Sequence, residues 1–184
     1  MRDDTLSVIA CGSSAASNLP GYLKWMRQEI DLPLRVLLTR SAERFVPRQV
    51  VAWHVDEVYG SDDPELNPTE FARRSLALVV LPATAHTLAA AALGLAGTPA
   101  QTALLAAERP ALFFPSMNGV MWRKPSVRRH VAALRAEGHT VVEPLEAEVF
   151  ELWQGEVTIG PVLPPPHQAA DCIIKWVEEG LSED

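Results

Sequence analysis

A carboxamide, two thioethers and an indole stand together in the segment Pro115–Trp122 (PSMNGVMW). The segment follows an apolar run at 110–114 (PALFF), which predicts a buried strand that stops at Pro115, because proline has no backbone N–H to donate. Open α/β sheets bind ligands beyond the carboxyl ends of their strands. The Asn118 carboxamide could hold an anion there without adding a titrating group. The segment therefore predicts a ligand-binding loop, and an ordinary structural turn is the alternative.

Two further loops combine small residues with hydroxyl groups, and each also follows an apolar run. Residues 12–17 (GSSAAS) follow 6–11 (LSVIAC), and residues 82–87 (PATAHT) follow 76–81 (LALVVL). Free backbone N–H groups at a strand-to-helix turn attract anions, so the first loop suits a phosphate. This signal is weak alone, because the loop lacks the G-x-G-x-x-G spacing of a dinucleotide site and a serine-rich turn is often only a turn.

The elements that position these loops alternate between apolar runs and amphipathic segments. Strands are expected at 6–11, 34–38, 76–81, 110–114 and 139–143, and a third strand or an extended segment is expected at 49–55. Helices are expected at 18–30, 69–75, 88–97, 98–108, 125–137 and 168–180. The alternation predicts a single α/β domain over residues 1–184, with a doubly wound parallel sheet of the Rossmann or flavodoxin-like type. The continuous run 76–81 is expected at the centre of the sheet, covered on both faces.

Three connections carry further expectations. Ser41 follows the second expected strand and is expected to N-cap a short helical turn. Residues 56–68 (DEVYGSDDPELNP) are expected to form a solvated acidic loop and no metal site, because their carboxylates lack the glycine-centred spacing of a calcium loop. Residues 148–153 and 156–160 flank Gln154-Gly155, and this pattern predicts a hairpin.

Composition and charge narrow the class of protein. The 184 residues contain no dividing linker, 48% of them are hydrophobic, and the formal net charge is -7 at pH 7. An acidic surface argues against nucleic acid as a main partner. The sequence has no signal-peptide pattern and no run of about 18 apolar residues, so we expect a cytoplasmic protein that does not span a membrane. Cys11 and Cys172 lie far apart and are expected to be free thiols.

Taken together, the three loops resemble those of the homo-oligomeric flavin-containing cysteine decarboxylases. That family includes lantibiotic peptidyl-cysteine decarboxylases and phosphopantothenoylcysteine decarboxylase. The segment Pro115–Trp122 matches the family motif PxMNxxMW at every specified position, and residues 82–87 resemble PASANT, with His86 where asparagine is usual. The resemblance runs from about Leu6 to the stretch 161–166 (PVLPPP). The related flavin prenyltransferases share the scaffold but lack PxMNxxMW, so they fit less well.

The resemblance implies FMN, held at a subunit interface of a trimer or dodecamer. The residues that it implies for the cofactor site are Gly12, Ser13, Ser14, Thr39, Ser41, Phe45, Ala83, Thr84, Ala85 and Met121. Within this set, the phosphate is expected at Gly12, Ser13, Ser14 and Thr39, and the ring is expected beside Phe45 and the 83–85 backbone. The residues that it implies for the substrate are Pro115, Met117 and Asn118. Asn118 is expected to contact the substrate carboxylate or the enethiolate.

One position departs from the family pattern. Family members carry a histidine upstream of PASANT that is taken to be the active-site base, and Pro68 stands at that position here. Proline cannot take a proton, so either His54 or His86 substitutes, or the reaction runs without that base. His86 is the better candidate because it lies within a motif, whereas His54 alternates with apolar neighbours, as structural or exposed histidines do. The expected catalytic residues are therefore Asn118 and His86.

The region after the parallel strands bears on the substrate. Residues 148–164 match the mobile segment that closes over a bound peptide in the peptidyl enzymes, and they lack the reactive cysteine of the phosphopantothenoyl enzymes, since Cys172 lies later. The resemblance implies oxidative decarboxylation of the C-terminal cysteine of a ribosomally made precursor peptide to an enethiol, which leads to an aminovinyl-cysteine ring. The alternatives are phosphopantothenoylcysteine decarboxylation and a non-catalytic flavin-binding regulatory subunit.

Overall fold

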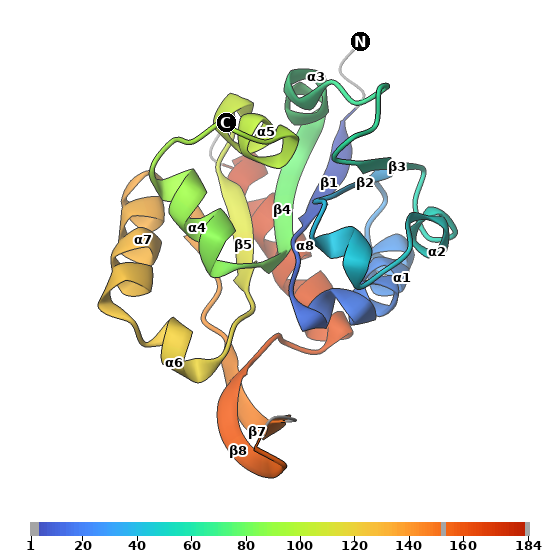
Figure 1. Cartoon of the computed structure of the whole chain (residues 1–184). Helices are drawn as coiled ribbons and strands as arrows, with labels where there is room; N and C mark the ends of the chain where they lie inside the picture. Colours follow the sequence, from blue (N-terminus) through green and yellow to red (C-terminus); the bar gives the residue numbers. More distant parts are fainter. Residues whose placement is uncertain (1–3, 152–153, 183–184) are drawn as a thin grey trace.

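A six-stranded parallel sheet runs through the centre of the protein in the order β3-β2-β1-β4-β5-β6 (Figure 1). The computed structural model describes residues 4–151 and 154–182. The strands are β1 (Thr5–Ala10), β2 (Leu34–Leu38), β3 (Glu57–Gly60), β4 (Ser75–Ala83), β5 (Ala111–Pro115) and β6 (Thr140–Val141). The expected doubly wound α/β fold is confirmed, and β4 lies in the middle of the sheet, as its continuous apolar run predicts.

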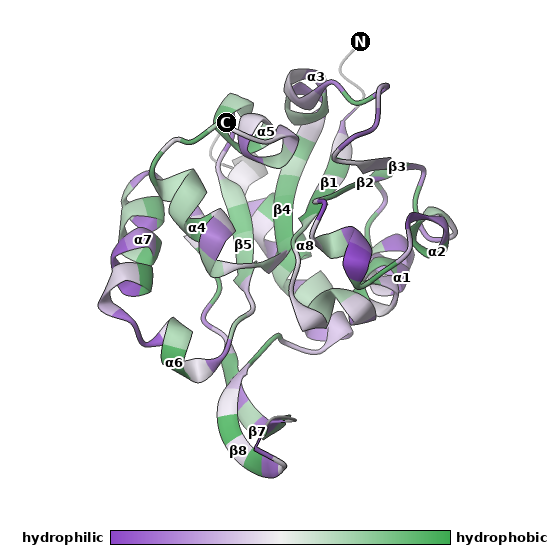
Figure 2. Ribbon diagram, in the orientation of Figure 1, coloured by the Kyte–Doolittle hydropathy of each residue, from purple (hydrophilic) through white to green (hydrophobic). Residues whose placement is uncertain are grey.

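Helices cover both faces of the sheet and bury two apolar cores. One face packs against α1 (Leu19–Glu29), α2 (Arg48–Ala52) and α8 (Pro166–Ser182). The other packs against α3 (Pro68–Arg73), α4 (Ala85–Ala92), α5 (Pro99–Ala106) and α7 (Pro125–Ala136). Successive strand residues point to opposite faces, so Val8 lies in the first core and its neighbour Ile9 in the second. The ribbon of β4 and β5 is mainly hydrophobic, whereas α7 has a hydrophilic side (Figure 2).

The prediction of a strand at residues 49–55 was wrong. Residues 48–52 form α2, which begins after Pro47, and the edge strand β3 lies inside the expected acidic loop. The buried Arg35 guanidinium explains the placement of β3. It donates to Glu57 at 2.8 Å and to Glu70 at 3.1 Å, and so holds a carboxylate-bearing segment beside β2. This pairing joins residues distant in sequence, and apolar periodicity does not reveal it.

The chain around the second and third expected loops also differs from expectation. The strand β4 continues through Ala83, and a cis peptide bond joins Leu81 to Pro82 within it. The helix expected at 88–97 is α4, which begins earlier because Thr84 caps it, accepting a hydrogen bond from the Thr87 N–H at 3.3 Å. It ends before Gly97, because Gly94 has a φ of 62° and adopts the left-handed conformation that terminates helices.

Ser41 occupies the N-cap position of the short 3-10 helix Ala42–Arg44, as expected, but its side chain makes no capping hydrogen bond. The backbone N–H of Ala42 instead donates to the Thr39 hydroxyl at 3.3 Å. The turn is therefore anchored two residues earlier, at Thr39, which directly follows β2.

An antiparallel hairpin projects from the body of the protein (Figure 1). Its strands are β7 (Leu145–Glu151) and β8 (Glu156–Val162), and they agree with the hairpin expected around Gln154-Gly155, although residues 152–153 lie outside the described residues. The hairpin carries exposed apolar side chains at Leu145, Phe150, Val157 and Ile159. Within the described ranges, no helix has both the length and the apolar character needed to cross a membrane.

Candidate active site

The three loops singled out in the sequence line one cavity of about 740 Å³ at the carboxyl ends of β1, β2 and β4 and beside the loop after β5. Its lining residues are Cys11, Gly12, Ser13, Thr39, Arg40, Ser41, Ser61, Asp62, Thr84, Ala85, His86, Thr87, Gly97, Thr98, Pro99, Ala100, Gln101, Ser116, Met117 and Met121. The edge formed by strand ends is where open α/β sheets bind ligands. The volume is within the range of pockets that hold a cofactor-sized molecule.

The loops after β1 and β2 touch at Gly12. A Cβ atom on Gly12 would lie 2.3 Å from the Ser41 Cβ and 2.9 Å from the Ser41 carbonyl carbon. Real Cβ contacts are never that short, so any side chain at this position would push the two loops apart. The glycine is therefore required by the close approach of the two phosphate-loop candidates, rather than by an unusual backbone angle.

Hydroxyl groups join the loops after β1, β4 and β5. The Ser13 and Ser116 hydroxyls lie 2.7 Å apart, and the Thr84 and Thr87 hydroxyls lie 3.1 Å apart. The Thr87 hydroxyl also donates to the Cys11 sulfur at 3.1 Å. The loops of the cavity wall are therefore joined by hydrogen bonds between side chains, and these side chains can also hydrogen-bond a ligand.

Cys11 lines the cavity with a buried thiol. Burial raises the pKa of Cys11 to about 11, although the hydrogen bond from Thr87 opposes that shift. The thiolate is the nucleophilic form of cysteine, and it is scarce at neutral pH when the pKa is this high. The motifs did not predict Cys11 and Thr87 as site residues, although Cys11 directly precedes Gly12.

The expected site residues fall into two groups. Those that line the cavity are Gly12, Ser13, Thr39, Ser41, Thr84, Ala85, His86, Met117 and Met121. Those outside the lining are Ser14, Phe45, Ala83, Pro115 and Asn118. Ala83 and Pro115 are buried in strands that pair with each other, while Ser14, Phe45 and Asn118 are exposed. The exposed residues do not contribute to the cavity wall.

The Asn118 side chain is held by a hydrogen bond from the backbone that follows it. Its Oδ1 accepts a hydrogen bond from the Met121 N–H at 2.9 Å, and it thereby caps the one-turn helix α6 (Gly119–Trp122). A backbone N–H requires an oxygen acceptor, so this contact fixes which way the carboxamide points. The Nδ2 group is left as the donor, which is the half of the amide that an anion needs.

The histidine positions are clearly separated. His86 lies in the first turn of α4 and lines the cavity, with its Nε2 atom 3.2 Å from the Gln101 Nε2 atom. His54 lines a separate depression with Trp53 and Lys24 and does not contribute to the cavity that the three loops line. Pro68 begins α3 behind the N-cap Asn67, a position that suits proline because the first helical N–H needs no partner.

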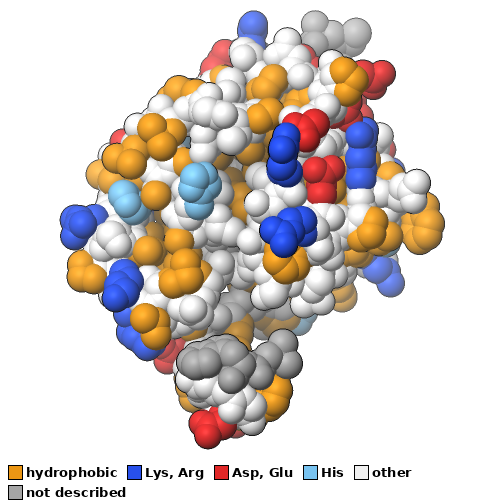
Figure 3. Space-filling model, viewed as in Figure 1, with side chains coloured by type: hydrophobic (Ala, Val, Ile, Leu, Met, Phe, Trp, Pro, Cys, Tyr) orange, Lys and Arg blue, Asp and Glu red, His pale blue; other side chains and the backbone are white. Residues whose placement is uncertain are grey.

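Two charged residues that the motifs did not predict, Arg40 and Asp62, also line the cavity. The Arg40 Nη2 atom lies 2.6 Å from the Asp62 Oδ1 atom, and both side chains are exposed. Figure 3 shows basic and acidic side chains adjoining one another over the β2 and β3 side of this face, with histidines over α4 and α7. Arg40 directly follows Thr39, so its place could have been anticipated, whereas Asp62 comes from the segment assigned to solvent.

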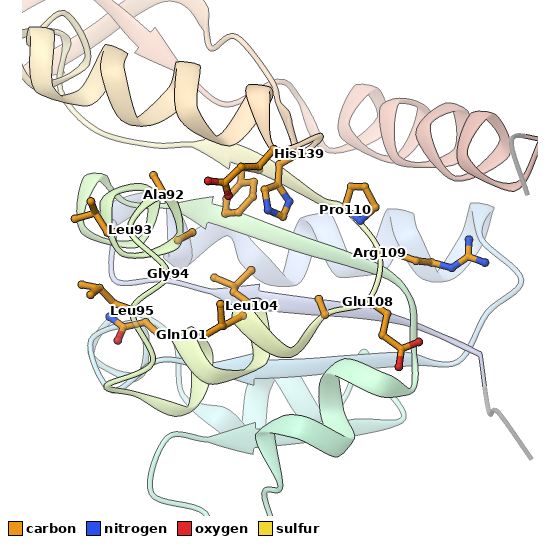
Figure 4. Close-up of a pocket in the computed structure, with 15 residues that line it drawn as sticks. Ala92, Leu93, Gly94, Leu95, Gln101, Leu104, Glu108, Arg109, Pro110 and His139 are labelled. Carbon is orange, nitrogen blue, oxygen red and sulfur yellow. The ribbon is translucent and has the colours of Figure 1, made fainter.

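A second cavity, of about 850 Å³, lies between the end of α4, α5 and the start of β5 (Figure 4). Its lining includes Leu93, Leu95 and Leu105, which are 63%, 48% and 59% exposed. Among the described residues, Gln101 alone lines both cavities. The residues expected from the motifs do not contribute to this second lining, so the first cavity is the candidate active site.

Comparison with known proteins finds decarboxylases that are similar over most of the chain. Mersacidin decarboxylase of Bacillus sp. (strain HIL-Y85/54728) is 32% identical over 182 residues, which cover 97% of this chain and 93% of that protein. The structure of MrsD from Bacillus sp. HIL-Y85/54728 gives a TM-score of 0.81 at 30% identity, covering 96% of this chain and 97% of that one. The FMN-dependent cysteine decarboxylase TvaF from thioviridamide biosynthesis gives a TM-score of 0.72 at 35% identity, covering 76% and 90%.

A family match spans almost the whole chain. The Flavoprotein family matches residues 1–178, a range that contains all three cavity loops, both cavities' lining residues and the hairpin. The motif resemblance, the sheet topology and the similar proteins all agree with that match. This protein therefore belongs to the Flavoprotein family.

Proposed function

We propose that this protein is an FMN-dependent peptidyl-cysteine decarboxylase. Its reaction is the oxidative decarboxylation of the C-terminal cysteine of a ribosomally made precursor peptide to an enethiol, which then forms an aminovinyl-cysteine ring. The observation that carries the proposal is that loops with all three decarboxylase motifs line a single cavity. The named activities of mersacidin decarboxylase and TvaF support it.

The residues at the strand ends fit a flavin mononucleotide. Gly12 allows the first two loops to approach, and the Ser13 and Thr39 hydroxyls offer donors for a phosphate. Thr39 accepts from the Ala42 N–H, so its own O–H is free to point at an anion. Arg40 follows Thr39 and lines the same cavity, where its guanidinium is paired with Asp62. The Thr84–Ala85 backbone and Met121 supply the wall along which the ring would lie.

The chemistry requires an electron sink, because a carbanion at the Cα of cysteine has none. When bound, FMN supplies that sink by accepting two electrons from the substrate. Oxidation of the Cβ–S unit leaves a thioaldehyde, the carboxylate then departs as CO2, and its electron pair forms the enethiolate. A cysteine thiol with a pKa near about 8.5 ionises partly unaided, so the reaction tolerates proline at position 68.

Asn118 and His86 are the proposed catalytic residues. The Asn118 Nδ2 group donates to the carboxylate or the enethiolate, because its Oδ1 already caps α6. His86 stands at the cavity wall beside the ring-binding loop. Met117, with Pro115 setting the start of its loop and Asn118 completing it, forms the proposed substrate wall.

The proposed peptide clamp is the segment 148–164, which contains most of the projecting hairpin. Its exposed Phe150, Val157 and Ile159 present an apolar surface for a peptide. The base of the hairpin adjoins the catalytic loop, since a Cβ on Gly119 would lie 3.3 Å from the Pro161 Cδ. Movement of the hairpin would therefore displace atoms next to Asn118.

The proposal includes a homo-oligomer, either a trimer or a dodecamer. The exposed Leu93, Leu95 and Leu105 beside the second cavity form an apolar surface of the kind that subunit contacts cover. Light scattering on the purified protein measures this directly. A monomer at micromolar concentration would contradict the assembly but not the cofactor.

Two alternatives differ in the substrate that they require. Phosphopantothenoylcysteine decarboxylation is disfavoured because residues 148–164 contain no cysteine, and a regulatory flavoprotein is kept open by Pro68. The test incubates FMN-loaded protein with phosphopantothenoylcysteine and with peptides ending in cysteine or serine. We expect CO2 release from the cysteine peptide alone. CO2 release only from phosphopantothenoylcysteine would favour phosphopantothenoylcysteine decarboxylation. No CO2 release from any of these compounds would favour a regulatory flavoprotein.

A further inference from the structure

Gln101 lines both cavities, and its side-chain oxygen and nitrogen have different hydrogen-bond partners. The side chain is 8% exposed and lies in the first turn of α5 (Figure 4). Its Oε1 accepts a hydrogen bond from the Gly97 N–H at 2.8 Å. Its Nε2 lies 3.2 Å from the Nε2 of His86.

The Gly97 contact determines the orientation of the amide. A backbone N–H can only donate, so the Gln101 oxygen must face Gly97 and the NH2 group must face His86. An NH2 group has hydrogens and no acceptor, so the His86 Nε2 must offer its lone pair. Which nitrogen of a histidine carries the proton is set by the hydrogen bond at the other one.

We infer that Gln101 is a positioning residue that holds His86 in the tautomer with its proton on Nδ1. His86 then works in the cavity as a hydrogen-bond donor through Nδ1, while Nε2 is unavailable as a base because it already accepts from Gln101. Within the described part of the chain, no residue accepts a hydrogen bond from Nδ1. The Nδ1–H group therefore remains for an acceptor oxygen of a ligand, a phosphate or a carboxylate.

This inference refines the role of His86. The tautomer follows from protein contacts alone, whereas the ligand that accepts from Nδ1 rests on the proposed function. A histidine that donates a hydrogen bond can do what the asparagine amide of PASANT does, since both present an N–H. The departure at His86 thus preserves a donor at that position, and it does not replace the base missing at Pro68.

The competing explanation is that Gln101 only caps α5. Thr98 accepts from the Gln101 N–H at 3.3 Å, and the Gln101 side chain reaches back to the backbone before the helix, which is a variant of the capping box. The Thr98-x-x-Gln101 spacing is visible in the sequence. A cap needs only the oxygen of Gln101, whereas the tautomer needs its NH2 group, so a substitution can separate the two roles.

The substitution that separates them is Gln101→Glu. A glutamate keeps an oxygen for the Gly97 N–H but presents an acceptor to His86, so the His86 proton should move to Nε2. Thr98→Ala is the matched control, because it removes the other half of the cap and leaves the Gln101–His86 contact. Gln101→Met removes both polar partners and should leave His86 without a fixed tautomer.

The measurement is long-range proton–nitrogen NMR of the full-length protein carrying 15N-labelled histidine, with and without FMN. The signal of His86 is assigned by its loss in His86→Asn. We expect the Nδ1–H pattern in the natural protein and in Thr98→Ala, and the Nε2–H pattern in Gln101→Glu. An Nε2–H pattern in the natural protein would overturn the inference, even if no variant folds.

The same samples separate this inference from the proposed function. A protein that never binds FMN but shows the Nδ1–H pattern refutes the proposed function and leaves the tautomer assignment standing. A protein that binds FMN but shows the same His86 pattern in Gln101→Glu refutes the tautomer assignment alone. Addition of inorganic phosphate to the FMN-free protein provides a probe for the free Nδ1–H donor, whose 15N signal should shift on binding.

Discussion

The hydroxyl oxygens of Ser13 and Ser116 lie 2.7 Å apart and join two loops that are separated by 103 residues in the sequence. One loop follows β1 and carries the proposed phosphate site, and the other follows β5 and leads to Met117 and Asn118. This contact places the cofactor end and the substrate end of the proposed site at a fixed separation. It is also a contact that substitution can remove without changing the fold.

Ser13→Ala should weaken FMN binding and leave the protein folded. Removing one hydrogen bond costs about 1 kcal/mol, which corresponds to roughly a fivefold loss of affinity. FMN titration followed by fluorescence quenching measures it. Ser17→Ala is the control, because the Ser17 hydroxyl is exposed and bonds only the Ser14 carbonyl oxygen. An equal loss in both variants would show that the Ser13–Ser116 contact has no particular role.

Gly12→Ala should abolish FMN binding. The added Cβ would lie 2.3 Å from the Ser41 Cβ, so the loops after β1 and β2 would have to separate. Gly21→Ala is the matched control, because its Cβ would meet nothing closer than 3.9 Å and helix α1 should gain roughly 0.5–1 kcal/mol. Normal FMN affinity in Gly12→Ala would contradict the close approach.

The raised pKa of the buried Cys11 thiol predicts that the protein loses stability at alkaline pH. Its pKa is raised from 9.0 to about 11 by burial, so the folded state keeps a proton that the unfolded state releases. The corresponding stability is fully present below pH 9.0 and is lost as the pH rises towards 11. Cys11→Ser removes this titration, and its hydroxyl preserves the hydrogen-bonding position beside Thr87.

Urea unfolding at a series of pH values from neutral to strongly alkaline compares the two proteins. The natural protein should lose on the order of 2 kcal/mol more than Cys11→Ser over this range. Other groups with raised pKa values, including Tyr22 and Cys172, titrate in both proteins and cancel in the comparison. Parallel stability profiles would mean that Cys11 does not remain protonated in the fold.

Asn118→Asp should lose activity while it keeps the helix cap. Aspartate caps a helix as well as asparagine does, so α6 should stay formed. The variant lacks the NH2 donor and places a charge next to a developing anion, which should lower kcat on the order of 100-fold. Asn118→Ala loses the donor and the cap together, and it should still retain FMN. Unchanged kcat in Asn118→Asp would remove Asn118 from the mechanism.

The strands were predictable where they are buried on both faces. The runs that became β1, β2, β4 and β5 are mostly apolar, which is how covered parallel strands look in sequence. The edge strand β3 was missed because its place depends on Arg35, whose partners Glu57 and Glu70 are remote in sequence. The apolar Val50 and Val51 that suggested a strand pack instead from α2.

The site was predictable only in part, because cavity walls are made by tertiary contacts. Gly12, Ser13, Thr39 and His86 were predicted as site residues, and all four line one cavity. Gln101 was missed because its motif signals only a helix cap, and its contact with His86 appears only when α4 and α5 pack together. The roles of the lining residues stay predictions until they are measured.

The measurement that tests the account most directly is accurate mass analysis of a peptide ending in cysteine after incubation with the FMN-loaded protein. The account predicts a product that lacks one CO2 and two hydrogens, with FMN bleached in equal amount when oxygen is excluded. A matched peptide ending in serine should be unchanged. An unaltered cysteine peptide, or loss of CO2 without the two hydrogens, would contradict oxidative decarboxylation.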